Sequence, residues 1–231
     1  MSDAYYGLTT FSPSGKLVQI EYATTAASKG VTTLGIKATD GIVIAAKKKT
    51  TTPLIDSSSI QKMFALDDHV GCTYSGMGPD SRVLIDSARK SCQQYKLTYH
   101  EPIPVSQLVR QISYLYQEFT QSGGVRPFGC SLLVAGVDAN GHHLYQIDPS
   151  GTFCAWKATA IGEGSSDAKS FLQKRYTSDM ELEDTIHTAL LTLKEGFSGK
   201  MTAENTQVGR VIEKRFEILT VDQLHDYLDQ I

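Results

Sequence analysis

The chain has 231 residues, a formal net charge of −3, 41% hydrophobic residues and 20% charged residues. These values are ordinary for a globular protein with a substantial core, and they argue against nucleic-acid binding through bulk charge. No stretch is long and apolar enough to cross a membrane, and residues 1–15 lack the apolar core of a signal peptide. We therefore expect a protein of the cytoplasm and nucleus, without a membrane partner.

Cysteine and histidine spacing gives no sign of a metal site or a disulfide framework. The sequence contains no HExxH motif, no CxxC pair and no EF-hand loop. His142 and His143 are adjacent at the start of a predicted strand, so we expect their side chains on opposite faces. We predict no metal and no cofactor, and we interpret the cysteines as buried free thiols. The cysteines are Cys72, Cys92, Cys130 and Cys154.

The N-terminal region is predicted to be an arm followed by a helix. Residues 1–12 are small, polar and aromatic without a period, as in a terminal arm. Residues 12–15, Ser-Pro-Ser-Gly, form a predicted turn that also offers a helix cap. From residue 16 to about residue 28, apolar residues fall on roughly one side of a helix, which Lys29 and Gly30 end. They are Leu17, Val18, Ile20, Tyr22 and Ala23.

The rest of the chain contains runs of strands separated by pairs of helices. Asp40-Gly41 lies between the first two strands and is a strong hairpin signal, while Asp67-Asp68 is interpreted as a solvated turn. The predicted strands are 31–37, 41–48, 62–66, 70–75, 129–138, 142–148, 152–162, 207–212 and 216–219. The predicted helices are 81–97, 105–120, 166–176, 182–194 and 221–228. This order indicates two antiparallel sheets face to face, with a helical layer outside each.

A pair of threonines, Thr32 and Thr33, follows Gly30 and Val31 at the start of the first predicted strand. A threonine freed by cleavage, whose own amine acts as base, is one way to build a nucleophile, with lysine and aspartate as helpers on adjacent strands. Three hypotheses follow: a hydrolase that needs processing, a relative that has lost catalysis, and a stand-alone binding domain. Processing predicts a mature chain that begins near residue 31, and a binding domain predicts a stable monomer.

Residues 9–23, TTFSPSGKLVQIEYA, resemble the N-terminal signature of proteasome alpha-type subunits. Further segments, among them YSGMGPDSRVLIDSARK and FTQSGGVRPFGCSLLVAG, extend the likeness over essentially the whole chain, and they are similar to the alpha-2 group in particular. The resemblance implies an α+β fold, the four-layer αββα sandwich of the N-terminal nucleophile hydrolases, with an N-terminal helix extension. It divides the chain into a gate arm and helix, residues 1–29, and a sandwich domain, residues 30–231.

The same resemblance implies that catalysis has been lost. In the catalytic beta-type relatives, cleavage after a glycine exposes a threonine. When that glycine is matched to Gly30, the nucleophile position falls on Val31, the aspartate position on Lys47 and the lysine position on Met63. Val31 has no hydroxyl, Lys47 has the wrong charge and Met63 cannot hold a proton. We therefore expect no catalytic residue here, and we interpret Thr32 and Thr33 as ordinary strand residues.

The resemblance also implies a place at the entrance of the proteasome. Alpha-type subunits form seven-membered outer rings over the beta rings, and the arms before their helices close the pore. The helix is expected to pack across the outer face of the sandwich. Pro13 and Tyr22 match positions that order the open gate, although Tyr22 as a plain packing residue is the alternative. The family's Tyr-Asp-Arg gate motif would fall on Ala4-Tyr5-Tyr6 and is absent.

A second implied site is a pocket for the C-terminal tails of activators or of a regulatory particle. Lys62 matches the lysine that meets the terminal carboxylate of such a tail, a pairing that an ammonium group can make. Gly76 and Met77 match the turn that lines the pocket. The alternative for Lys62 is a solvent-facing strand lysine. The implied function is that of a non-catalytic structural and gating subunit in the complex that degrades ubiquitinated and unfolded proteins.

Overall fold

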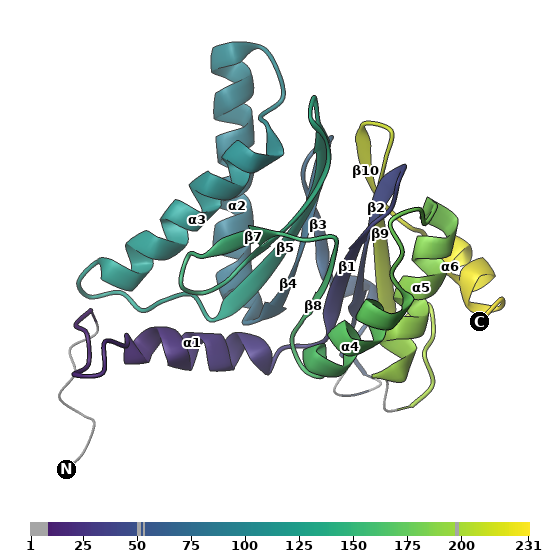
Figure 1. Cartoon of the computed structure of the whole chain (residues 1–231), viewed down its shortest axis with the longest axis horizontal. Coiled ribbons are helices and arrows are strands. Elements are labelled where there is room, and N and C mark those ends of the chain that lie inside the picture. The colour runs from purple at the N-terminus through teal and green to yellow at the C-terminus, as the bar shows by residue number, and fades with distance from the viewer. Residues whose placement is uncertain (1–8, 50–51, 53, 197–198) are drawn as a thin grey trace.

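Two five-stranded antiparallel sheets lie face to face at the centre of the molecule (Figure 1). The structure is a computed structural model that describes residues 9–49, 52, 54–196 and 199–231. The first sheet has the strand order β10-β9-β2-β1-β8, and the second has the order β3-β4-β5-β6-β7. Strands of the first sheet are β1 (Thr33–Lys37), β2 (Gly41–Lys47), β8 (Ala158–Ile161), β9 (Thr206–Ile212) and β10 (Arg215–Ile218). Strands of the second sheet are β3 (Met63–Asp67), β4 (Val70–Gly76), β5 (Cys130–Asp138), β6 (Gly141–Ile147) and β7 (Phe153–Ala155).

Helices cover the outer face of each sheet, and this arrangement confirms the predicted four layers. The second sheet carries α2 (Gly78–Tyr99) and α3 (Val105–Gln121), with a buried apolar cluster between helices and strands. The first sheet carries α4 (Ser165–Arg175), α5 (Leu182–Glu195) and α6 (Val221–Leu228), with a cluster of its own. A single-turn 3₁₀ helix, Ser57–Ser59, lies in the loop before β3.

A third cluster fills the space between the two sheets. Ile42 and Ile44 of β2 meet Ala135 of β5 and Leu144 of β6 there, and all four are buried. Because β2 is buried on both faces, its sequence is a continuous apolar run rather than an alternating one. The sandwich is therefore held by three apolar layers, two outer and one inner.

The helix α1 (Val18–Ser28) lies across one end of the sandwich, where it contacts β4 and β5 (Figure 1). The broad outer face expected for this helix is instead occupied by α2 and α3. The predicted cap is also wrong, because the Ser12 hydroxyl accepts from Lys16 N at 3.0 Å inside the turn and α1 begins later, at Val18. Only its small residues Ala23 and Ala27 are buried, while Tyr22 is 58% exposed.

Three further details differ from the sequence-based expectations. The sequence predicts one strand over residues 152–162, but they form β7 and β8, which belong to different sheets. Cys154 on the short strand β7 is exposed, although Cys72, Cys92 and Cys130 are the predicted buried free thiols. Asp67 is not solvated, since its side chain is only 7% exposed.

Candidate functional site

The end of the sandwich next to α1 contains the junction where the N-terminal segment enters β1. A Cβ atom on Gly30 would lie 2.0 Å from Gly76 N, and one on Gly76 would lie 2.3 Å from Gly129 O. Gly76 also has a φ of +108°, which favours glycine. Backbone therefore passes directly against backbone, and side chains at these two positions would separate α1 from β4.

Hydrogen bonds tie the same junction to the loop that follows β8. Glu163 N donates to Gly30 O at 2.8 Å, and the Thr32 hydroxyl donates to Glu163 O at 2.7 Å. Thr33 is fully buried, and its hydroxyl lies 3.3 Å from both Val31 O and Tyr74 O. Both threonine hydroxyls are thus committed to backbone carbonyls as structural donors.

Two of the three positions that the resemblance assigned to lost catalysis lie at this junction, and the third lies between the sheets. Val31 immediately precedes the buried threonines, and Lys47 N donates to Thr32 O at 3.0 Å. Met63 begins β3 and is 1% exposed within the cluster between the sheets. An alkyl group, an ammonium and a thioether offer neither an oxygen nucleophile nor a carboxylate base at these positions.

Lys62 is buried, which excludes the alternative of a solvent-facing lysine. The residue is 5% exposed, its backbone N–H donates to Gln207 Oε1 at 2.9 Å, and its Nζ lies 3.4 Å from the centroid of the Tyr74 ring. Burial lowers the pKa of Lys62 from 10.5 to about 7. Among the described residues no ion pair includes Lys62. The ammonium therefore has an aromatic face as its neighbour, and an anion would stabilise its charged form.

The turn after β4 follows shortly after Tyr74, whose ring lies against this lysine. Met77 N donates to Gly129 O at 3.0 Å, and the Met77 side chain is 43% exposed. A hollow of about 380 Å³ lies next to the turn and is lined by Phe64, Tyr74 and Arg82 among others. Tyr74 thus belongs both to the hollow and to the surroundings of Lys62.

Pro13 and Tyr22 are both exposed and belong to the turn before α1 and to α1 itself. The turn is closed by Gly15 N donating to Ser12 O at 2.8 Å, with Gly15 at a φ of +78°. The structure therefore places the two predicted gate positions on the same segment but gives no contact between them. Ala4-Tyr5-Tyr6, the place of the missing gate motif, lies outside the described residues.

Comparison with known families settles what kind of chain carries this junction. A family model for the N-terminal signature of A-type proteasome subunits matches residues 6–26, and one for proteasome subunits in general matches residues 27–211. The chain belongs to the proteasome alpha-type subunits. It is therefore a non-catalytic subunit of the 20S core, and the first of the three hypotheses about catalysis, a hydrolase that needs processing, is rejected.

Individual relatives place this alpha-type subunit in the alpha-2 group, as the sequence predicted. It is 77% identical to the proteasome alpha type-2 subunit of Trypanosoma brucei brucei over 231 residues, which is the whole of both chains. It is 56% identical to the proteasome alpha type-2-A subunit of Arabidopsis thaliana over 234 residues, again with complete coverage of both. It is 54% identical to the proteasome alpha type-2 subunit of Drosophila melanogaster over 226 residues, or 98% of this chain and 97% of the relative.

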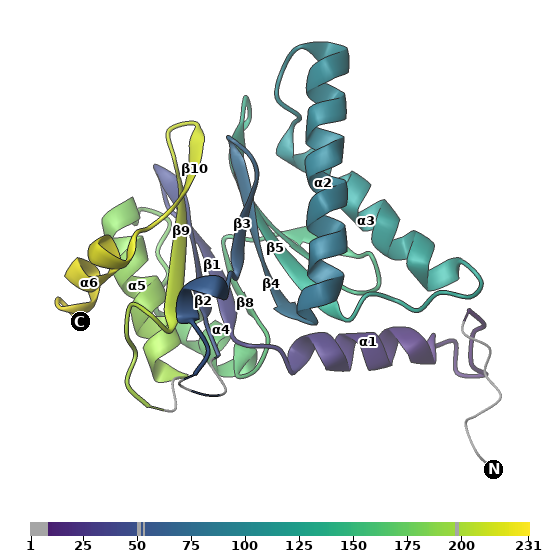
Figure 2. The same ribbon diagram turned by 180° about the vertical axis from the view of Figure 1, so that it is seen from behind.

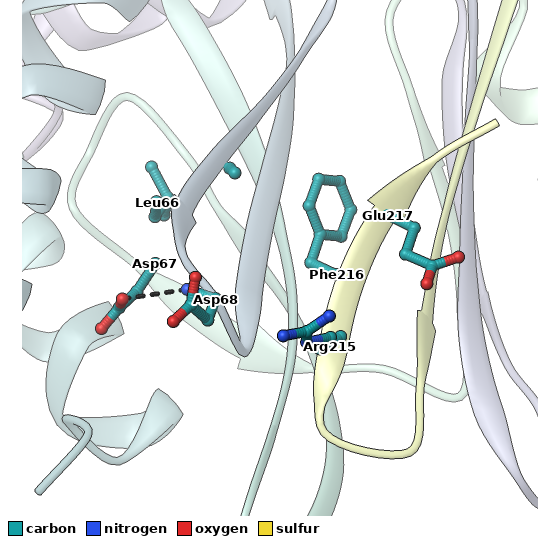
Figure 3. A pocket seen from close by; sticks show the side chains of 7 residues that line it. Leu66, Asp67, Asp68, Arg215, Phe216 and Glu217 are labelled. Carbon is teal, nitrogen blue, oxygen red and sulfur yellow. Dashed lines mark hydrogen bonds between the residues drawn. The ribbon is translucent and has the colours of Figure 1, made fainter. Parts of the chain in front are cut away.

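Another hollow of this alpha-type subunit lies at the opposite end of the sandwich from the junction. It measures about 520 Å³ and is lined by β3 residues and by Arg215, Phe216 and Glu217 of β10 (Figure 3). Asp67 Oδ1 accepts there from Asp68 N at 2.9 Å. Within the part of the chain that the structure describes, no cluster of metal ligands and no helix able to span a membrane is found.

Sequence reasoning missed the residues that hold the junction together. The sequence predicted Ser75 only as the end of a strand, Gly76 only as part of the turn that lines the pocket, and Gly162 only as the end of a strand. Gly162 has a φ of +90°, and a Cβ there would lie 2.5 Å from both Ser75 Oγ and Val31 O. The only sequence signal is a glycine at the end of each strand, which is common in turns of every kind.

Proposed function

We propose that this alpha-type subunit of the 20S core is a structural and gating member of an outer ring, which helps to close the pore, to dock activators and to assemble the particle. The observation that carries the proposal is the junction at Gly30. The N-terminal segment continues through α1 into β1 without a gap, and its backbone is packed against Gly76 and bonded to Glu163. A segment built into the fold in this way is suited to remain in the mature protein.

The proposed loss of catalysis follows from the residues at the three matched positions, Val31, Lys47 and Met63. Val31 supplies no nucleophile, and the cleavage that would be needed to expose a threonine would break a bonded, close-packed backbone. Residues 1–29 then act as gate arm and helix, and residues 30–231 act as the sandwich domain. Pro13 and Tyr22 are proposed to position the arm, because both are exposed on the segment that leads to it.

Lys62 is proposed to receive the terminal carboxylate of an activator tail. An amine that is buried against an aromatic ring is costly to charge. No acidic side chain among the described residues forms an ion pair with Lys62, so a carboxylate that reaches the amine can bind its ammonium form without competition from such a pair. Gly76 and Met77 form the adjacent turn, and the exposed Met77 side chain offers an apolar contact to the tail.

Proposed partners include neighbouring alpha subunits in a seven-membered ring and the beta ring beneath. Several large apolar side chains are exposed on the helices, as expected for faces that are covered in an assembly. They are Tyr22 of α1, Val83, Leu97 and Tyr99 of α2, and Tyr114 of α3. Residence in the cytoplasm and nucleus remains a prediction that accompanies this assembly.

Photo-cross-linking tests the docking proposal on assembled core particles. A tail peptide with a photoreactive residue near its free C-terminus should label this chain, and Lys62→Ala should reduce the labelling about tenfold or more, the scale of one charge-assisted hydrogen bond. The matched control is Lys90→Ala, because Lys90 is exposed on α2. Equal labelling of the Lys62→Ala and wild-type particles would refute the role of Lys62. The same conclusion would follow if a peptide whose C-terminal carboxylate is amidated labelled the wild-type particles as strongly as the peptide with the free carboxylate.

Intact mass tests the proposed retention of the N-terminal segment. The native chain recovered from core particles should have a mass that includes residues 2–30. A mass that begins at Val31 or Thr32 would show that cleavage occurs, and the structural role of the junction would then be wrong.

A further inference from the structure

A further hollow lies between the β3–β4 turn and the loop that joins α2 to α3, and we call it the Asp67 hollow. Its volume is about 390 Å³, which is within the range of pockets that bind small molecules. Such pockets combine apolar walls with a few polar groups that orient the ligand. The apolar residues that line this hollow include Pro102, Ile103, Pro104 and Val137. The charged residues that line it are Asp67, Asp68, Lys96, Glu101, Asp138 and Lys214.

The Asp67 carboxylate has one buried oxygen that is left unused. Its side chain is 7% exposed, and it points away from Arg215 and Phe216 of β10 (Figure 3). Its Oδ1 accepts from Asp68 N at 2.9 Å, but no hydrogen-bond donor among the described residues reaches Oδ2. A buried acceptor without a donor is costly, so this oxygen needs an explanation.

His69 presents a second acceptor to the same oxygen. Its Nε2 lies 2.8 Å from Ile103 O, and a carbonyl can only accept, so Nε2 carries the proton. In the neutral ring this leaves Nδ1 as an acceptor, 3.8 Å from Asp67 Oδ2. A protonated ring would not supply the missing hydrogen bond either, because 3.8 Å is too long for one. Two buried acceptors therefore face each other with no donor between them.

The other carboxylates and the lysines of the hollow do not fill this gap. Asp138 is already satisfied, because Oδ2 accepts from Val105 N at 3.0 Å and Oδ1 accepts from Asn140 N at 2.8 Å. Lys96 and Lys214 are exposed, and no ion pair of the described residues includes either of them. Four carboxylates against two lysines leave the lining negatively charged, which attracts a cation.

We propose that the Asp67 hollow binds a small organic ammonium. The ammonium donates one N–H to Asp67 Oδ2 and another to His69 Nδ1, and the apolar part of the ligand contacts the walls of the hollow. Hydrogen bonds of about 2.8 Å allow a single nitrogen to reach two atoms that are 3.8 Å apart. A neutral hydroxyl has only one proton and cannot donate to both. This site is independent of the proposed gating and docking functions, and it can fail without affecting them.

Fluorine NMR on assembled core particles tests the site with 4-fluorobenzylamine, which is protonated at neutral pH. Wild-type particles should broaden its signal, and 4-fluorobenzyl alcohol should bind at least about tenfold more weakly, the scale of one charge-assisted hydrogen bond. Asp67→Asn should weaken binding of the amine by a similar factor, because it removes the charge and its amide can donate to His69 Nδ1. The matched control is Asp68→Asn, which removes the same charge from an exposed residue of the same hollow and should retain binding.

Each other outcome overturns the inference. Equal binding of the amine to wild-type and Asp67→Asn particles removes the carboxylate from the site, and equal binding of the alcohol reduces the site to an apolar hollow. Tenfold tighter binding of Nα-acetyl-lysine methylamide would assign the hollow to a lysine of another protein.

A density map provides a second test if Asp67→Asn particles fail to assemble. Wild-type core particles soaked with the amine should show ligand density that joins Asp67 and His69. A water molecule alone between these two side chains would overturn the proposal, because water would then satisfy both acceptors.

Discussion

Gly162 lies where β8 ends, and it is the glycine whose replacement should damage the junction most directly. Its φ is +90°, a conformation that costs an L-residue about 1–2 kcal/mol. A Cβ would lie 2.5 Å from Ser75 Oγ, 2.5 Å from Val31 O and 2.8 Å from Gly30 O. Two of these atoms belong to backbone, so the contact cannot be relieved by turning a side chain.

The expected cost of Gly162→Ala combines strain with lost hydrogen bonds. Moving the loop away from the junction weakens the bonds of Glu163 N to Gly30 O and of the Thr32 hydroxyl to Glu163 O, each worth about 1 kcal/mol. Together with the backbone strain, this gives a loss of roughly 3–4 kcal/mol in the free energy of unfolding. The matched control is Gly164→Ala, because Gly164 has a φ of +69° but nothing within 4 Å of its Cβ position.

Urea unfolding of the purified chain measures both variants. The only tryptophan, Trp156, provides the fluorescence signal, and it lies beside Lys169 of α4, the helix that follows this loop. Gly164→Ala should lose about 1–2 kcal/mol from strain alone, and Gly162→Ala about 2 kcal/mol more. If the two variants are equally stable, close packing at the junction contributes nothing and the reasoning is refuted.

Three further predictions concern stability and its pH dependence. Burial lowers the pKa of Lys62 to about 7, so the unfolded chain holds one more proton between about pH 7 and pH 10.5. Lys62→Met should therefore raise stability by up to about 5 kcal/mol at pH 6 and by progressively less as pH approaches 10, in urea titrations at several pH values. A gain that does not vary with pH would contradict this assignment. The bidentate bond from Arg126 lowers the pKa of the Asp80 carboxyl below 3.8, so Asp80→Asn should cost about 2 kcal/mol at pH 7, and that cost should shrink as pH falls below about 4. A constant cost down to pH 3 would argue against a charged Asp80. Thr220→Ala removes the capping box made with Gln223 at the start of α6 and should cost about 1 kcal/mol, with faster amide exchange confined to that helix.

Local patterns were sufficient for most of the elements. The Asp40-Gly41 signal placed the β1–β2 hairpin, and helical periodicity placed α3 within one residue of its observed end. Observed α6 has the same bounds as its prediction. These elements are predictable because their signals lie within a few residues of one another in sequence.

The misses depend on tertiary contacts. The sequence of residues 152–162 is largely apolar along its length, but Trp156 and Lys157 carry the chain from one sheet to the other, where Trp156 N donates to Leu144 O and Lys157 O accepts from Lys37 N. No local pattern shows that crossing. Tyr22 fits an apolar helical stripe, yet only alanines fit the narrow space against β4 and β5, so the tyrosine faces outward.

The environment of the candidate site residues could not be predicted from the sequence. Matching a single glycine pointed to Val31, Lys47 and Met63, and the structure has Val31 and Lys47 beside Thr32 but Met63 in the cluster between the sheets. The burial of Lys62 beneath Tyr74 could not be read from a lysine before a short strand, because the ring that covers it belongs to the neighbouring strand. Ser75 could not be found from the sequence because the two carbonyls beside its hydroxyl, Ala27 O and Val31 O, are distant in sequence.

The lengths of the outermost strands bear on how this subunit joins other proteasome subunits. The edge strands β3, β7, β8 and β10 contain five, three, four and four residues, whereas β5 in the middle of its sheet contains nine. On one flank, where β3 and β10 lie next to each other (Figure 2), Phe216 N donates to Asp68 O at 2.8 Å. Short edges whose backbone groups are partly used offer little template for adding a strand from another chain. In the ring that we propose, neighbours would then recognise each other through helix faces and loops. Where those side chains differ between subunit types, the sequence of each subunit would encode its position.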